Sequence, residues 1–166
     1  MNILVLGVGN ILLTDEGIGV RTIEMLEQYY DFADNIEIVD GGTAGMELLE
    51  IMANKDHVIL VDAVNTGAQP GTVVTLKDDE VPALFRNRIS PHQLGISDLL
   101  GVMSLTGEIP QRFSLFGVVP FSIETGVELS FKMLPIKLQL VEMVVNELSA
   151  LGFTPTPKEL VQELIA

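Results

Sequence analysis

Carboxylate side chains follow three apolar runs of this chain, each of which has the pattern of a buried strand. The first run, Ile3–Leu6, leads through a glycine turn into a loop with Asp15 and Glu16, and the two later runs end at Asp40 and Asp62. Short aliphatic runs that end at glycine or aspartate are typical of strands in a parallel sheet. Because ligands of open α/β sheets bind at the carboxyl ends of the strands, we expect these carboxylates to share one edge and one site.

Of the two histidines in the chain, only one is expected at that edge. His92 follows Ser90 and Pro91, a combination that favours a helix start. A helix N-terminus disfavours imidazolium, so the ring stays neutral, as a metal ligand must. His57 precedes the strand that Asp62 ends, about 16 Å away at roughly 3.3 Å per residue, and we expect it on the surface of the opposite edge. Carboxylates with one imidazole suit a borderline divalent ion such as zinc or nickel.

Each of these side chains also has a purely structural interpretation. Asp40 and Asp62 could cap the amides of the loops that follow them. Asp15 and Glu16 could stabilise the dipole of the next helix, and His92 could be a partly buried, hydrogen-bonded residue. Other catalytic templates are missing from the sequence, which has no cysteine, no G-x-S-x-G elbow and no H-E-x-x-H helix.

The elements that must position these residues alternate between strands and helices, which predicts a mostly parallel sheet covered on both faces. The predicted strands are Ile3–Leu6, Ile36–Val39, Val58–Val61, Thr72–Leu76 and Phe113–Val119. The predicted helices are Gly17–Tyr30, Met46–Asn54, Ser90–Leu105, Pro135–Leu151 and Lys158–Ile165, whereas Phe121–Phe131 has no assignable pattern. Only nine residues separate Asp62 from Thr72. A parallel crossover needs a dozen or more, so we expect the fourth strand to be antiparallel.

Length and composition limit the fold and the partners. The 166 residues fit one α/β domain of three layers, residues 1–166, with about five strands. A hydrophobic content of 48% argues against disorder. The net charge of −14 makes nucleic acid and anionic lipid poor partners. No apolar run approaches the roughly 18 residues of a membrane span, and no signal peptide is recognisable, so we expect a cytoplasmic protein.

The loop after the first strand begins like a dinucleotide-binding fingerprint but departs from it. Gly7 and Gly9 open a G-x-G-x-x-G pattern, whereas Leu12 stands where the last glycine belongs. Asp15 and Glu16 then add negative charge where a phosphate would need bare amides. The loop is better suited to a cation than to an anion, although a degenerate nucleotide-binding protein remains an alternative.

Four motifs resemble those of the nickel–iron hydrogenase maturation endopeptidases. They are GVGNILLTDEGIGV from Gly7, DGGTAG from Asp40, VDA from Val61 and SPHQLG from Ser90, and they occur in the order of that family. The resemblance implies a single α/β domain that removes the C-terminal extension of a hydrogenase large-subunit precursor once nickel has been inserted.

The resemblance also implies the roles of individual residues. The metal-contacting positions of the family match Glu16, Asp62 and His92, and Asp40 matches a nearby acidic position. The nickel would belong to the substrate, with no organic cofactor, and the chain would act as a monomer on the precursor. The catalytic candidates are Glu16, Asp40 and Asp62: the metal could polarise the scissile carbonyl or activate water, or a carboxylate could act as base. A nickel-dependent chaperone that binds the precursor without cutting it is a further alternative.

Overall fold

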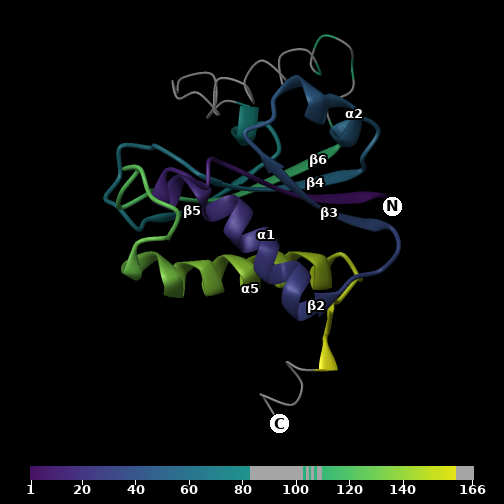
Figure 1. Cartoon of the computed structure of the whole chain (residues 1–166). Coiled ribbons are helices and arrows are strands. Elements are labelled where there is room, and N and C mark those ends of the chain that lie inside the picture. The colour runs from purple at the N-terminus through teal and green to yellow at the C-terminus, as the bar shows by residue number, and fades with distance from the viewer. Residues whose placement is uncertain (83–102, 104, 106, 108–109, 160–166) are drawn as a thin grey trace.

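The computed structural model describes residues 1–82, 103, 105, 107 and 110–159, which form a five-stranded sheet in the order β3-β1-β4-β6-β5 (Figure 1). Its strands are β1 (Ile3–Val8), β3 (Ile36–Gly42), β4 (His57–Ala63), β5 (Val73–Lys77) and β6 (Arg112–Val118). β1 pairs in parallel with β3 and β4, and β4 pairs in parallel with β6. β5 is antiparallel to β6, which confirms the direction predicted from the short connection before it.

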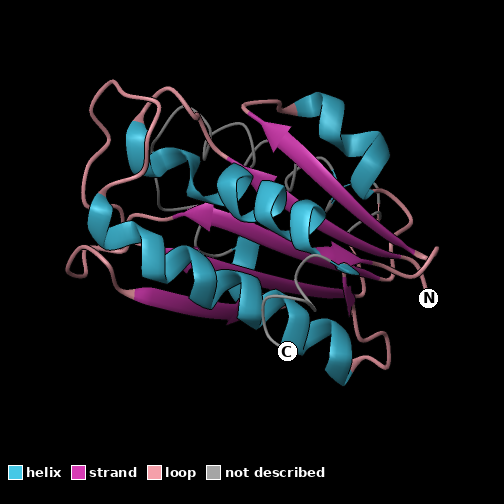
Figure 2. Ribbon diagram, turned by 60° about the horizontal axis from the view of Figure 1, so that its bottom comes forward, coloured by secondary structure: helices cyan, strands magenta, loops and turns pink. Residues whose placement is uncertain are grey.

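Helices cover both faces of the sheet. On one face lie α1 (Ile18–Tyr29) and α5 (Leu134–Ala150), which cross the strands in front of the sheet in Figure 2. On the other face lies α2 (Leu49–Met52), above the sheet in Figure 1. A short 3-10 turn precedes each of these helices: η1 (Thr14–Gly17), η2 (Met46–Leu48) and η3 (Phe131–Met133).

The central strands β1 and β4 are buried at every position because each face of the sheet has its own core. Along β1, Ile3 and Val5 pack under α1 and α5, whereas Leu4 and Leu6 point into the core on the α2 side. β4 divides its side chains in the same way. Strands buried on both faces lose the alternation of polar and apolar residues, and this explains why continuous aliphatic runs predicted them correctly.

The strand order reverses direction between β1 and β4. From β1 the chain adds β3 on one side and then returns to add β4 on the other. Such a switch point separates the loops that leave the two strands and opens a crevice at their carboxyl ends. The fold therefore places the residues that follow β1 and those at the end of β4 around one crevice.

Some predicted elements differ from those observed. The helix predicted over Met46–Asn54 is shorter, since Ala53 is extended and Asn54 has a left-handed φ of 63°. A two-residue ribbon of β2 (Tyr30–Asp31) and β7 (Thr156–Pro157) was not predicted, because so short a pairing has no periodicity to detect. Nearly all of the helices predicted over Ser90–Leu105 and Lys158–Ile165 lies outside the described residues. Within the described part of the chain, no helix is long and apolar enough to cross a membrane.

Candidate active site

Glycines permit two close backbone approaches, one between the residue after β1 and η1 and the other between the start of α1 and the end of β4. Gly9 has a φ of +136°, and a Cβ atom added there would lie 2.0 Å from the Glu16 carbonyl oxygen. A Cβ atom on Gly19 would lie 2.2 Å from the Val61 carbonyl oxygen, at the end of β4. Only glycine permits backbones to approach so closely, and the pattern that resembles a dinucleotide fingerprint therefore has a packing role here.

Two of the candidate carboxylates come from neighbouring segments at the switch point. Glu16 lies in η1 with 9% of its surface exposed, and η1 contacts β4. Asp62 is fully buried in β4, where it is paired in register with Gly117 of β6. The predicted convergence of the loop after β1 with the end of β4 is thus present in the backbone arrangement.

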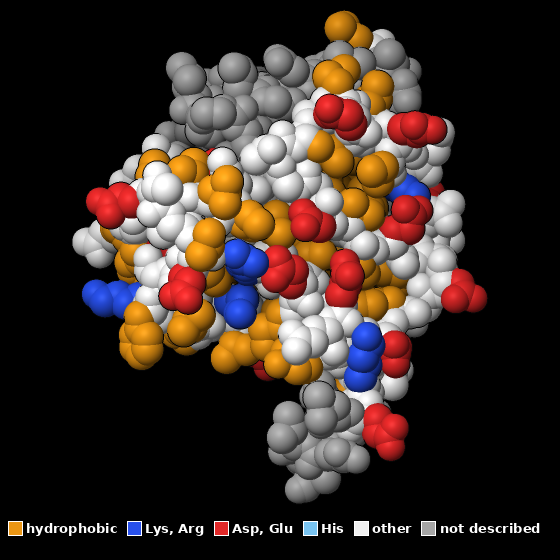
Figure 3. Space-filling model, in the orientation of Figure 1, with side chains coloured by type: hydrophobic (Ala, Val, Ile, Leu, Met, Phe, Trp, Pro, Cys, Tyr) orange, Lys and Arg blue, Asp and Glu red, His pale blue; other side chains and the backbone are white. Residues whose placement is uncertain are grey.

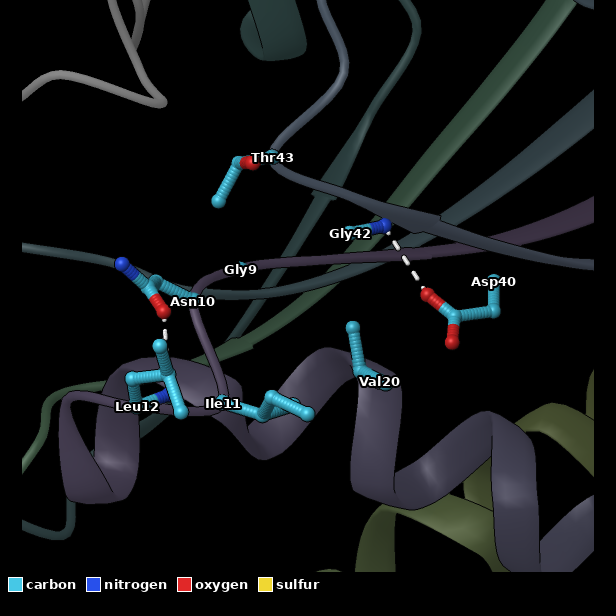
Figure 4. Close-up of a pocket in the computed structure, with 8 residues that line it drawn as sticks. All are labelled: Gly9, Asn10, Ile11, Leu12, Val20, Asp40, Gly42 and Thr43. Carbon is cyan, nitrogen blue, oxygen red and sulfur yellow. Dashed lines mark hydrogen bonds between the residues drawn. The ribbon is translucent and has the colours of Figure 1, made fainter. Parts of the chain in front are cut away.

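Asp40 occupies a different position on the same edge. It is exposed, and it lines a pocket of about 270 Å³ between the loop after β1 and the end of β3 (Figure 4). The other lining residues are Gly9, Asn10, Ile11, Leu12, Val20, Gly42 and Thr43. Oδ1 of Asp40 accepts a hydrogen bond of 2.9 Å from the Gly42 amide, so the capping role considered from the sequence accounts for one of its two oxygens. Neither Glu16 nor Asp62 lines this pocket.

Asp15 has a role distinct from that of its neighbour Glu16. Its side chain is fully buried, and its carboxylate accepts four hydrogen bonds from the segment after β6. The donors are the amides of Phe121 (3.0 Å), Ser122 (3.0 Å) and Ser130 (2.7 Å) and the hydroxyl of Ser130 (2.7 Å). Asp15 therefore holds a loop rather than an ion, and the sequence offered no signal for its partners because the segment 121–131 had no pattern.

The two histidines were expected at opposite edges of the sheet. His92 lies outside the described residues, and among the residues that are described no three His, Cys, Asp or Glu side chains gather closely enough to hold a metal ion. His57 opens β4 at the end opposite Asp62, as expected. The prediction that His57 is a surface residue was wrong: only 3% of the residue's surface is exposed.

His57 is buried because polar side chains from distant elements cover it. Its Nε2 lies 3.0 Å from the Ser114 hydroxyl, and the Glu147 carboxylate of α5 is 3.7 Å away. Burial lowers the pKa of His57 from its ordinary value of 6.5, and the Glu147 charge opposes that shift. The ring is therefore part of a structural polar cluster at the amino end of the sheet, together with Ser114, Glu147 and Lys77.

Comparisons with known proteins agree with the fold and the motifs. The family model for hydrogenase maturation proteases matches residues 20–147. The chain is 51% identical to the hydrogenase 2 maturation protease of Escherichia coli, with 98% of this chain and all of that protein covered. It is 40% identical to the hydrogenase expression/formation protein HupM of Azotobacter chroococcum, over 95% of this chain and 77% of that protein.

Solved structures give the same result. The hydrogenase maturating endopeptidase HybD of E. coli superposes with a TM-score of 0.91 at 52% identity, over 95% of this chain and 98% of that one. The [NiFe] hydrogenase maturation protease HybD of Thermococcus kodakarensis superposes with a TM-score of 0.71 at 25% identity, over 87% and 97% of the two chains. These matches agree with the close glycine contacts and with the carboxylates at the switch point. The chain therefore belongs to the hydrogenase maturation protease family and is a peptidase.

Proposed function

We propose that this peptidase removes the C-terminal extension of a nickel–iron hydrogenase large-subunit precursor after nickel has been inserted, and that it does so in the cytoplasm as a monomer. The observation that carries the proposal is the packing of η1, with Glu16, against β4, with Asp62, at the switch point of the sheet. Membership of a peptidase family favours cleavage over the two alternatives, a chaperone and a nucleotide-binding protein.

In this proposal the nickel belongs to the substrate. Glu16 and Asp62 supply oxygen donors, and His92 supplies the nitrogen donor that the resemblance assigns to it. Three such ligands suit nickel or zinc and leave coordination positions for groups of the precursor. The chain has no cysteine, so it offers no thiolate to retain a metal tightly of its own. The site then recognises a precursor that already contains nickel, and no organic cofactor is needed.

Asp40 is the best candidate for the general base. Hydrolysis requires a group that takes a proton from the attacking water and returns it to the leaving amide nitrogen. Unlike the buried Asp62, Asp40 is exposed and borders the pocket between two loops, where an extended peptide could reach it (Figure 4). The nickel, held by Glu16, Asp62 and His92, would polarise the scissile carbonyl. Glu16 and Asp62 then act as catalytic residues through the metal.

The acidic surface supports the expected choice of partner. Red carboxylate side chains are spread over the face drawn in Figure 3, where blue Lys and Arg side chains are few. The whole chain carries 23 acidic and nine basic residues. Such a surface repels nucleic acid and attracts basic segments of a protein partner.

The proposal is tested by incubating the protein with precursor in nickel-loaded and nickel-free forms and measuring the intact mass of the large subunit. We expect loss of a C-terminal fragment from the nickel-loaded form alone. A stable complex with no change in mass would show a chaperone instead. Cleavage of both forms at equal rates would show that nickel is not recognised.

The role of Asp40 is tested separately with Asp40→Asn. A general base contributes about 10²–10⁴-fold to the rate, so kcat should fall by a factor in this range while KM for the nickel-loaded precursor stays within about twofold. If Asp40→Asn retains the parent kcat, Asp40 is not the base.

A further inference from the structure

Two loops far apart in the sequence are fastened together beside the candidate site. Besides the four bonds to its carboxylate, Asp15 donates its own amide to the Ser122 carbonyl at 3.1 Å. The Thr14 amide donates to the Gly126 carbonyl at 2.8 Å, and the Gly126 amide donates to the Leu12 carbonyl at 2.9 Å. We call the segment 121–130 the clamp loop; its residues 121, 122, 124, 126 and 130 form hydrogen bonds with the loop after β1 and with η1.

The turn that the clamp loop holds is in a conformation that the sequence alone disfavours. Thr14 has a φ of +49°, a left-handed conformation that is rare for a β-branched residue. Its hydroxyl lies within hydrogen-bond distance of the carbonyls of Ser122 (2.8 Å) and Glu124 (3.0 Å). Residues in such conformations persist where the surroundings over-determine them, and they gather at functional sites.

Glu16 follows this strained turn directly, so its backbone position depends on the same contacts. We propose that Asp15 is a positioning residue: by binding the clamp loop, it sets the place from which Glu16 meets the nickel of the precursor. The inference rests on the function proposed above. It goes further, because it makes the segment after β6 a part of the site although none of its residues is a candidate ligand.

A buried carboxylate could instead serve stability alone, and the chain offers a matched control for that possibility. Ser114, in the polar cluster at the opposite end of the sheet, is 1% exposed and lies within hydrogen-bond distance of His57, Lys77 and Glu147. Ser114→Ala therefore removes buried hydrogen bonds without touching the switch point. If stability alone mattered, Ser114→Ala and Ser130→Ala would affect the site equally.

The experiment compares Asp15→Asn, Ser130→Ala and Ser114→Ala in the full chain, with nickel(II) chloride as the probe in calorimetric titrations and thermal unfolding followed in parallel. Groups that orient metal ligands typically contribute about 10–100-fold to affinity, so Asp15→Asn should weaken nickel binding by at least about tenfold. Ser130→Ala should weaken it less but in the same direction, and Ser114→Ala should leave it within about twofold. KM for the nickel-loaded precursor should rise in the same order.

Each outcome is decisive. A folded Asp15→Asn variant with the affinity and KM of the parent would overturn the inference. If Asp15→Asn does not fold, Ser130→Ala decides: equal nickel affinities for Ser130→Ala and Ser114→Ala would overturn it. Glu16→Gln separates this inference from the proposed function. If Glu16→Gln weakens nickel binding and Asp15→Asn does not, only the positioning role of Asp15 fails. If Glu16→Gln leaves nickel binding unchanged, Glu16 is not a nickel ligand, and both the positioning role of Asp15 and the role of Glu16 in the proposed function fail.

Discussion

Gly19→Ala tests how closely α1 must approach the strands for the site to form. The added Cβ would lie 2.2 Å from the Val61 carbonyl oxygen and 2.5 Å from that of Val8. An ordinary contact needs about 3.5 Å, so the start of α1 must withdraw by about 1 Å. Both neighbours are backbone atoms of central strands, which cannot rotate aside. We expect a loss of about 1–3 kcal/mol in the free energy of unfolding, the usual cost of overpacking, or somewhat more.

The same displacement should also lower the processing rate. The start of α1 is continuous with η1, so Glu16 should move with it, and a misplacement of about 1 Å can cost about 10² in rate. Chemical denaturation would give the change in stability, and the mass of the precursor over time would give the change in rate.

Gly67→Ala is the control for Gly19→Ala. Gly19 lies in α1 and has no positive φ, whereas Gly67 has a left-handed φ of +82°, and an added Cβ there would meet nothing within 4 Å. It should cost about 1–2 kcal/mol through backbone strain alone and leave the processing rate unchanged. A Gly19→Ala variant with the parent's processing rate would refute the view that this close approach positions Glu16.

Three further results are expected. Enzyme treated with chelator should still process nickel-loaded precursor at the parent rate; a dead enzyme revived by zinc would contradict a substrate-borne metal. His92→Ala should abolish processing, whereas His57→Gln, assayed below its melting temperature, should retain it; the reverse result would mean that the site is at the other edge. Because burial lowers the pKa of His57, the folded state holds this ring neutral while the unfolded state protonates it below about pH 6.5. This contribution to stability is therefore complete above pH 6.5 and is lost as the pH falls. His57→Gln should flatten the decline in melting temperature between about pH 5 and 7. An unchanged slope would contradict the view that His57 is buried in its neutral form.

The sheet could be predicted from the sequence because its physical causes are local. Burial on both faces makes the parallel strands continuous aliphatic runs, and a connection too short for a crossover forces one strand to be antiparallel. The carboxyl edge of the sheet follows from the same rules. That edge collects the segments with Glu16, Asp40 and Asp62, so the candidate site could be predicted from the sequence.

The separate roles of similar residues depended on tertiary contacts. Asp15 and Glu16 are adjacent and chemically alike, and no local pattern distinguishes them. Asp15 is buried because it binds Ser130, 115 positions away along the chain. His57 is buried beside Ser114 and Glu147, and the sequence around His57 does not predict these partners either. Periodicity and turn chemistry report the elements and their directions, whereas the partner of a buried polar group is chosen when those elements pack, because only then does desolvation require it to find one.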